Sequence, residues 1–482
     1  MISRNEILWE INIMVHQKNY LSFTIAGLLS VSTSVFALEK PKTMDEMWKI
    51  IEMQQKQIEA LQKNAVTAPA TQLTDKTNAP ATALATTDVK KLEHKTDVLS
   101  QEVEKLRTNL SIPEEAKYKS MYGMGPAASK VYQVGQGLSI GGYGEASYRN
   151  IVGDKGTLKD SADMYRMILY TGYKFNDKII FNSEFEVEHG TTGRNGGTVS
   201  IEFAALDFFI DPMANVRAGM VLTPMGFINQ IHEPPFYFGN NRPEVERTII
   251  PSTWRELGVG LFGQLTPELS YTAYVMNGMD AANFTSKGIR DGRQSGGNAQ
   301  AENFGYVARL DYTPDYLTGV TLGGSAYVGN SGQDKLYAGE NIDAFTQLYE
   351  GHIQWKYRGL EWRALGSVGR IGDAAILSKA KGQTIGSENY GWYTEVGYDV
   401  LPLIIPSTDQ YFAPFFRYEQ MDSLAKVPNG LPDNGNLNRQ IYQFGLQYKP
   451  IPNVVIKADY RNFEAQKGIA ADDVNLGFGF IF

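Results

Sequence analysis

The sequence predicts an all-β transmembrane barrel of about 16 antiparallel strands, preceded by an N-terminal α-helical coiled coil. Three observations lead to this fold class. Segments of alternating apolar and polar residues run from Leu138 to Phe482, the connections between them are alternately short and long, and the last segment ends on an aromatic residue. The composition agrees, because the chain has 48 Gly, 27 Tyr and 23 Phe but, after the N-terminal leader, no apolar run long enough for a membrane helix.

Residues 1–37 are expected to be a signal peptide. The apolar run from Leu21 to Phe36 follows Lys18, and small residues surround Ala37, after which we expect cleavage. Met14 is the better initiator, which makes the residues before it an extension. An uncleaved anchor helix is the alternative.

Two segments, 38–64 and 89–112, are predicted to be helical parts of a coiled coil, since apolar residues recur in both at heptad a and d positions. An Ala/Thr/Pro linker at 65–88 separates them, and a second linker at 113–137 leads to the barrel. Helices this short seldom stand alone in water, so we expect self-association in two or three strands; two amphipathic helices lying on another surface are the alternative. The seam residues are Met44, Met47, Ile51, Gln54, Ile58 and Leu61, then Val89, Leu92, Thr96, Leu99, Val103, Leu106 and Leu110.

The barrel itself is predicted for 138–482. Phe181, Phe185 and Val187 alternate with Asn182 and Glu184, and the apolar set is expected to face lipid. Seven short turns and eight long loops join sixteen such segments, which places both ends of the barrel in the periplasm. Sixteen strands enclose an aqueous channel.

The segment from Pro224 to Thr253 is a long connection with five prolines and no sustained period of 2 or 3.6. A connection of about thirty residues is usually functional or disordered, and its apolar content argues against disorder. We therefore expect it to fold into the lumen and narrow the pore; a surface loop packed on itself is the alternative. The predicted constriction residues are Arg242, Arg247, Glu244, Glu246, Glu233, Phe236 and Tyr237.

Arg242 and Arg247 are expected to face the water path and attract small anions, partly offset by Glu244 and Glu246. Along the strands, the alternation also places a set of charged residues on the lumen side, where rings of charge tune which ions enter. The predicted pore-lining residues are Arg166, Arg217, Arg309, Lys356, Arg363, Arg417, Lys457, Arg461, Glu184 and Glu186.

Catalytic chemistry is not expected. The chain has no cysteine, which excludes disulfides, cysteine metal sites and thiol chemistry. Of the five histidines, only His352 is inward and strand-borne, and no sequence signal pairs it with a serine. His232 adjoins Glu233, but adjacent residues seldom chelate one ion together, so a loop-packing role is favoured. We expect no enzyme activity, no catalytic residue, no metal and no cofactor.

Four runs stand out: GQGLSIGGYGE at 135–145, HEPP at 232–235, TIIPSTWRE at 248–256 and GIRDGR at 288–293. They resemble the barrel porins grouped with the phosphate-selective outer-membrane porins, and the similarity covers most of 125–482. The resemblance implies a passive, trimeric, sixteen-stranded channel. Phosphate-selective members carry an arginine ladder and a lysine cluster at the constriction, whereas the central loop here contains no lysine. The N-terminal coiled coil is also similar to that of trimeric porins that pass dicarboxylates.

The sequence therefore predicts an outer-membrane porin for small hydrophilic solutes, with a mild preference for anions such as phosphate or dicarboxylates. We expect it in a bacterial outer membrane, surrounded by lipid, as a homotrimer whose coiled coil lies in the periplasm and is open to a periplasmic partner. The net charge of −8 gives no reason to expect a nucleic-acid partner. The alternative is a structural protein that tethers the outer membrane to the periplasm through the coiled coil.

Overall fold

The computed structural model describes residues 119–482, apart from 194–195 and 434. The predicted signal peptide, both coiled-coil segments and the linker between them lie outside the described residues. By its internal contacts the chain divides into two units, 1–88 and 89–482, and every described residue belongs to the second. No helix within the described ranges has both the length and the apolar character needed to cross a membrane.

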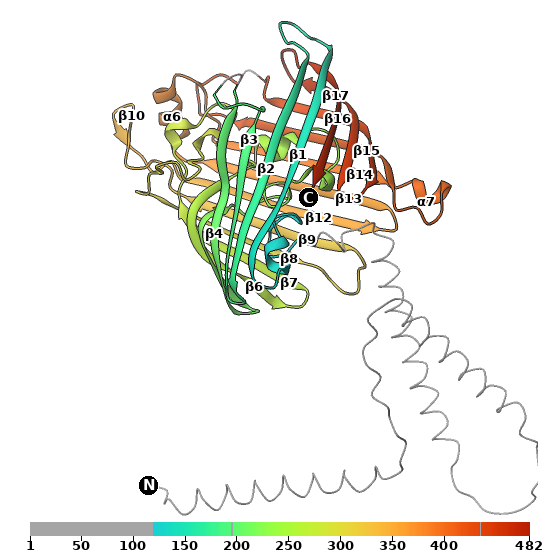
Figure 1. Ribbon diagram of the computed structural model, residues 1–482. Coiled ribbons are helices and arrows are strands. Elements are labelled where there is room, and N and C mark those ends of the chain that lie inside the picture. Colours follow the sequence, from blue (N-terminus) through green and yellow to red (C-terminus); the bar gives the residue numbers. More distant parts are fainter. Residues whose placement is uncertain (1–118, 194–195, 434) are drawn as a thin grey trace, which may run out of the picture. The chain divides into compact units, whose positions relative to one another are not determined.

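Sixteen strands form a closed barrel in which neighbouring strands are antiparallel (Figure 1). Fifteen of the sixteen neighbour pairs follow the order of the chain, with β9 next to β12, and β1 pairs with β18 to close the ring. The barrel predicted from the alternating pattern is confirmed. Its strands are β1 Gly137–Gly153, β2 Ser161–Asn176, β3 Ile179–Glu188, β4 Thr198–Asp211, β5 Ala214–Leu222, β6 Arg255–Thr266, β7 Leu269–Asn277, β8 Phe304–Tyr312, β9 Val320–Gly329, β12 Thr346–Tyr357, β13 Leu360–Ile371, β14 Glu388–Tyr398, β15 Tyr411–Lys426, β16 Asn438–Ile451, β17 Val454–Ala465 and β18 Asp472–Ile481.

The C-terminus takes part in closing the barrel. Tyr143 of β1 lies opposite Ile481 of β18, and the terminal Phe482 exchanges backbone hydrogen bonds of 2.9 and 3.0 Å with Gly142. Closure removes the free strand edges that would otherwise pair with other chains. The predicted last strand therefore completes the ring.

Most connections alternate in length as the sequence predicts, but the one at 399–410 is longer than four of the connections at the other end. One end of the barrel carries seven connections, at 177–178, 212–213, 267–268, 313–319, 358–359, 399–410 and 452–453, the sixth of which contains α7 Leu401–Ile404. The other end carries eight, at 154–160, 189–197, 223–254, 278–303, 330–345, 372–387, 427–437 and 466–471. Within this second set lie β10 Leu336–Tyr337, β11 Glu340–Asn341 and α6 Ala374–Lys381.

Side chains alternate between the two faces of the wall. On β3, Phe185 is 41% exposed while Asn182, Glu184 and Glu186 are buried on the lumen side. On β6, Leu257, Val259 and Leu261 are all exposed on the outer face. An apolar outer band over a polar interior is the arrangement that suits a barrel surrounded by lipid.

The residues just before β1 pack inside the barrel. Met124, Val131 and Tyr132 are buried in one apolar cluster with wall residues such as Ile168 and Phe203. The Tyr132 hydroxyl donates to Asp207 of β4 at 2.7 Å, and α4 Lys130–Gln133 forms the end of this segment. Residues 121–133 therefore line part of the lumen, a role that the sequence pattern of the predicted linker does not reveal.

The long connection at 223–254, which we call the inner loop, crosses the lumen as predicted. It contains η1 Pro234–Phe236 and α5 Glu244–Thr248. Tyr237 donates to Glu145 of β1 at 2.6 Å, whereas Glu246 accepts from Tyr393 of β14, also at 2.6 Å. Because β1 and β14 are separated by several strands in the ring, these two contacts hold the loop inside the barrel.

Phe238 fixes the middle of the inner loop to the wall. Its ring stacks on Phe415 of β15 with centroids 5.1 Å apart. The ring also lies directly over Gly397 of β14, where an added Cβ would come within 2.3 Å of the Phe238 ring. Glycine at 397 is therefore required for this close approach of loop and wall.

We expect Gly397→Val to destabilise the barrel by about 1–3 kcal/mol, because the added side chain overpacks the Phe238 site. The urea midpoint of unfolding for the purified protein in detergent measures this. Gly351→Val is the matched control, since a Cβ at Gly351 meets no atom within 4 Å. Equal midpoints for the two variants would show that Phe238 is not held against this wall.

Candidate functional site: the inner loop and its arginines

Basic residues of the wall hold the inner loop through its backbone carbonyls. Arg363 donates to the carbonyl of Phe236 at 3.0 Å, and Arg417 donates to that of Phe238 at 2.7 Å. Lys457 donates to Gly239 at 2.8 Å. Charged donors form stronger hydrogen bonds than neutral ones, so these contacts fix the path of the loop.

The same wall also pairs its charges internally. Arg417 and Arg363 both bind Glu395, at 2.6 and 2.5 Å, and all three side chains are buried. Four more predicted pore-lining arginines pair in the same way: Arg166 with Glu145, Arg217 with Asp207, Arg309 with Asp311 and Arg461 with Asp473. Lys356 lies 4.0 Å from Glu361. Most of the predicted pore-lining cations thus lie in the lumen wall with their charge already matched.

Two acids of the inner loop serve the loop's own structure. Glu233 is fully buried and accepts from the backbone N–H groups of Ala127 and Ala128 at 2.9 and 3.4 Å. Burial raises the pKa of Glu233 to about 8. Glu246 accepts from the backbone N–H of Ile228 at 2.7 Å as well as from Tyr393. Neither carboxylate is placed where it faces water.

The remaining predicted constriction residues lie in α5 or before it. Glu244 binds Arg247 at 2.8 Å and Arg461 at 3.2 Å. The Tyr237 ring lies 3.7 Å from the Lys457 ammonium, and the half-buried Phe236 packs against the cluster of the N-terminal segment. The Arg247 side chain is 39% exposed, the most open of the loop's charged groups.

Arg242 differs from every wall arginine described above. It is only 8% exposed, yet its Nε and Nη2 atoms have no hydrogen-bond partner, and it forms no ion pair with any described residue. The strongest charge acting on it is that of another cation, Arg166. Tyr143, Tyr237 and Glu145 offset this repulsion. An anion at Arg242 would supply acceptors for its two unpaired nitrogen atoms.

A second loop adds two arginines that the sequence analysis did not select. The connection at 278–303, with η2 Ala281–Asn283 and η3 Arg290–Gly292, folds onto the inner loop. Arg290 donates to the carbonyls of Arg247 and Ser252, and Arg293 donates to that of Ser252 at 2.9 Å. The sequence signal for these two arginines is the GIRDGR run at 288–293, which stands out only through its resemblance to a porin family.

These loop cations are close enough to influence one another. Burial, followed by the charges of Arg293, Arg247 and Arg242, lowers the pKa of Arg290 to about 9. We call Arg242, Arg247, Arg290 and Arg293 the loop arginine group. Its positive charges are held by backbone carbonyls and by loop packing, and only Arg247 has a carboxylate partner within the described residues.

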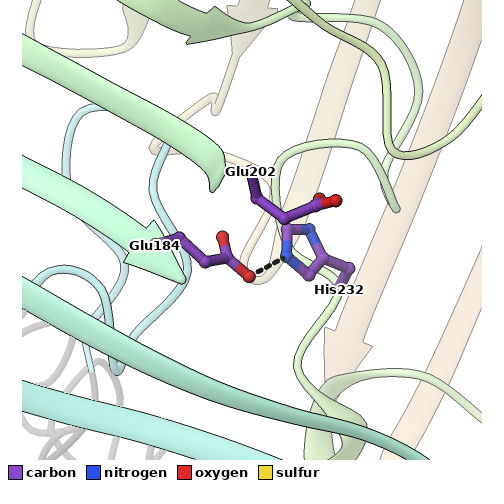
Figure 2. Close-up of side chains that lie close together, drawn as sticks. All are labelled: Glu184, Glu202 and His232. Atoms are coloured by element: carbon purple, nitrogen blue, oxygen red, sulfur yellow. Dashed lines mark hydrogen bonds and ion pairs between the residues drawn. The ribbon is translucent and has the colours of Figure 1, made fainter. Parts of the chain in front are cut away.

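His232 lies beside two wall acids, Glu184 of β3 and Glu202 of β4 (Figure 2). Its Nε2 is 3.2 Å from a Glu184 oxygen, and Glu202 binds Arg255 at 2.5 Å. Burial, together with the charge of Arg242, lowers the pKa of His232 to about 3, so the imidazole is neutral. The contact between His232 and Glu184 of the wall was not predictable from the His232–Glu233 pair.

His352 and the nearby Ser325 do not form a pair of catalytic base and nucleophile. Its Nδ1 lies 2.9 Å from Glu350 and its Nε2 lies 3.0 Å from Asp311. Ser325 donates to Glu350 at 2.7 Å and not to the imidazole. Both ring nitrogens are therefore occupied by carboxylates.

The comparisons with known proteins agree with this architecture. No protein-family model matches the sequence. An uncharacterized protein of Aquifex aeolicus is 38% identical over 373 residues, which cover 74% of this chain and 82% of that protein. Two solved structures share the fold at 14% identity over 72% of this chain: OmpF of Salmonella typhi in complex with daunomycin, with 98% of its chain covered and a TM-score of 0.51, and the outer membrane channel DcaP of Acinetobacter baumannii, with 97% covered and a TM-score of 0.50. The fold is that of the outer-membrane porins.

We expect Arg417→Gln to lower the free energy of unfolding by about 3–5 kcal/mol, because it breaks a buried ion pair and removes a donor from the Phe238 carbonyl. The urea midpoint in detergent measures this. Arg370→Gln is the control, since Arg370 is largely exposed and lies 3.9 Å from Glu388, an arrangement that stabilises by about 0–1 kcal/mol. A loss no larger than that of the control would show that the Arg417 contacts do not hold the loop.

Proposed function

Because the chain belongs to the same family as the uncharacterized protein of Aquifex aeolicus and has the fold of the outer-membrane porins, we propose that it forms a passive, water-filled channel across a bacterial outer membrane. A closed barrel with a polar inner face and an apolar outer face supports this proposal. We infer that the inner loop narrows the lumen, so that small hydrophilic solutes pass and large ones do not.

The channel prefers anions, and the observation that carries this proposal is the unpaired guanidinium of Arg242. An anion at Arg242 would supply the missing hydrogen-bond acceptors for Nε and Nη2. Guanidinium groups bind phosphate and carboxylate in a bidentate manner, which favours phosphate and dicarboxylates as solutes. Arg247, Arg290 and Arg293 extend the positive potential along the same loops.

The preference is mild because part of this charge is compensated. Glu244 neutralises Arg247 and also contacts Arg461. Glu246 and Glu233, in contrast, are buried with their own donors and do not oppose a passing anion. The net attraction thus rests mainly on Arg242 and on the two arginines of the second loop.

We propose further that the protein assembles as a homotrimer. A homotrimer in outer-membrane lipid, with the coiled coil on the periplasmic side, fits the exposed apolar belt of the barrel. An apolar groove of about 1050 Å³ on its outer face would be covered by lipid or by a second copy. The groove lies over β1, β2 and β15 to β18 and is lined by residues that include Tyr148, Met164, Leu446, Ile456 and Leu476.

We expect the double change Arg242→Ala and Arg247→Ala to shift the reversal potential in a salt gradient toward cations. A unit charge about 4 Å from a permeating ion in water contributes about 1 kcal/mol, which corresponds to about a fivefold change in relative permeability for each charge removed. Planar-bilayer recording measures this. Lys155→Ala, which removes an exposed charge paired with Asp160 in the connection at 154–160, is the control and leaves the potential unchanged. A double variant that matched the wild type would place these arginines outside the ion path.

Phosphate and succinate should reduce the chloride current more than a neutral sugar does at equal concentration, because they compete for Arg242. The reduction should be lost in Arg242→Ala. A purified protein that gave no stable open channel in bilayers would favour the tethering alternative. Equal effects of sugar and phosphate on the chloride current would mean that the channel has no anion preference.

A further inference from the structure

Two strands and the inner loop bring together three side chains that can bind a metal ion. Glu184 comes from β3, Glu202 from β4 and His232 from the inner loop. One ligand atom from each lies within 4.8 Å of the other two, and Figure 2 shows the two carboxylates beside the imidazole. The ligand atoms of a tetrahedral ion with bonds of about 2.0–2.2 Å are about 3.3–3.6 Å apart, so small side-chain rotations bring these three into range.

A β-bulge produces this arrangement. Glu184 pairs with Phe203, but the next residue, Phe185, pairs with Ile201, so Glu202 is the extra residue on β4. Strict alternation from the inward Phe203 would direct Glu202 to the outer face. The bulge instead directs Glu202 into the wall interior beside Glu184, which is how bulges commonly position functional side chains.

Each of the three residues has one buried polar atom without a hydrogen-bond partner: Glu184 Oε2, Glu202 Oε2 and His232 Nδ1. All three side chains are at most 2% exposed. Leaving one buried acceptor unsatisfied costs about 1–3 kcal/mol, and three in one cluster of side chains indicate a missing partner.

The charges nearby favour a cation as that partner. Glu186 is the strongest charge acting on Glu184, and Glu202 is the strongest acting on Glu186, so three carboxylates repel one another. Of the neighbouring guanidinium groups, Arg255 binds the other oxygen of Glu202 and Arg166 binds Glu145. Arg242 offsets part of the charge of Glu184. A divalent ion relieves the remaining repulsion.

We propose that Glu184, Glu202 and His232 bind a divalent transition-metal ion such as zinc. An imidazole nitrogen with two carboxylate oxygens matches zinc and similar ions, whereas calcium and magnesium prefer oxygen alone. The ion joins the inner loop to β3 and β4 immediately beside Arg242. The ion thus has a structural role at the constriction. The sequence instead leads us to expect a loop-packing role for His232 and no metal.

Zinc binding tests this proposal directly. The full chain, purified in detergent and stripped with a chelator, is dialysed against zinc at pH 7.5, and bound metal is quantified per chain. We expect one ion per wild-type chain, with an affinity that falls by about tenfold or more in both His232→Gln and Glu202→Gln. Cobalt as a substitute should give an absorption spectrum with a nitrogen ligand that His232→Gln loses.

His189→Gln is the control, because His189 pairs with Asp163 away from the cluster and should retain full binding. Heat-modifiable migration in a gel identifies variants that keep the folded barrel, and either of the two ligand variants is sufficient if the other fails to fold. A folded wild type that takes up no zinc would show that the carboxylates share a proton instead, and binding unchanged in both ligand variants would also overturn the site. Neither result depends on whether the barrel conducts ions.

Discussion

The pairing of Glu395 with two arginines is the interaction on which the lumen depends. Arg363 and Arg417 share this one buried carboxylate, and each uses its remaining donors on an inner-loop carbonyl, Phe236 or Phe238. A guanidinium has five donors in a planar fork, so it can satisfy the wall acid and the loop backbone together. The wall therefore supplies the hydrogen bonds that an irregular loop inside a barrel cannot make for itself.

The fold was predictable from the sequence because its signals are local. The period of 2 along β3 and the alternation of turn and loop lengths each depend on residues next to one another. Even the lumen position of the inner loop could be inferred, since its length and its apolar content left few alternatives. The packing of residues 121–133 inside the barrel was not predictable, because no periodic pattern marks a segment that is held by contacts to Asp207 and Glu233.

The site was predictable only in part, for a different physical reason. Alternation tells which residues face inward, and Arg417 and Arg461 are indeed in the lumen wall, but it cannot tell which inward charges are already paired. A bulge on β4 shifts the register by one residue, and no local pattern reveals that it brings Glu202 beside Glu184 and His232. Arg290 and Arg293 lie on another loop, and only tertiary folding brings them to Arg247.

The charged residues of the lumen consequently divide into two groups with separate roles. Those paired within the wall, such as Arg217 with Asp207, hold the barrel and the loop in shape. Because their charges cancel, they contribute little net electric field in the lumen. Arg242 has no ion-pair partner among the described residues although it is buried, an arrangement that is unfavourable unless the surrounding structure fixes it. His232 lies on the same loop ten residues before Arg242, and its contact with Glu184 of β3 provides such a restraint. We propose that a stiffened loop near His232 and an attraction of anions at Arg242 both follow from one loop folded against β3 and β4.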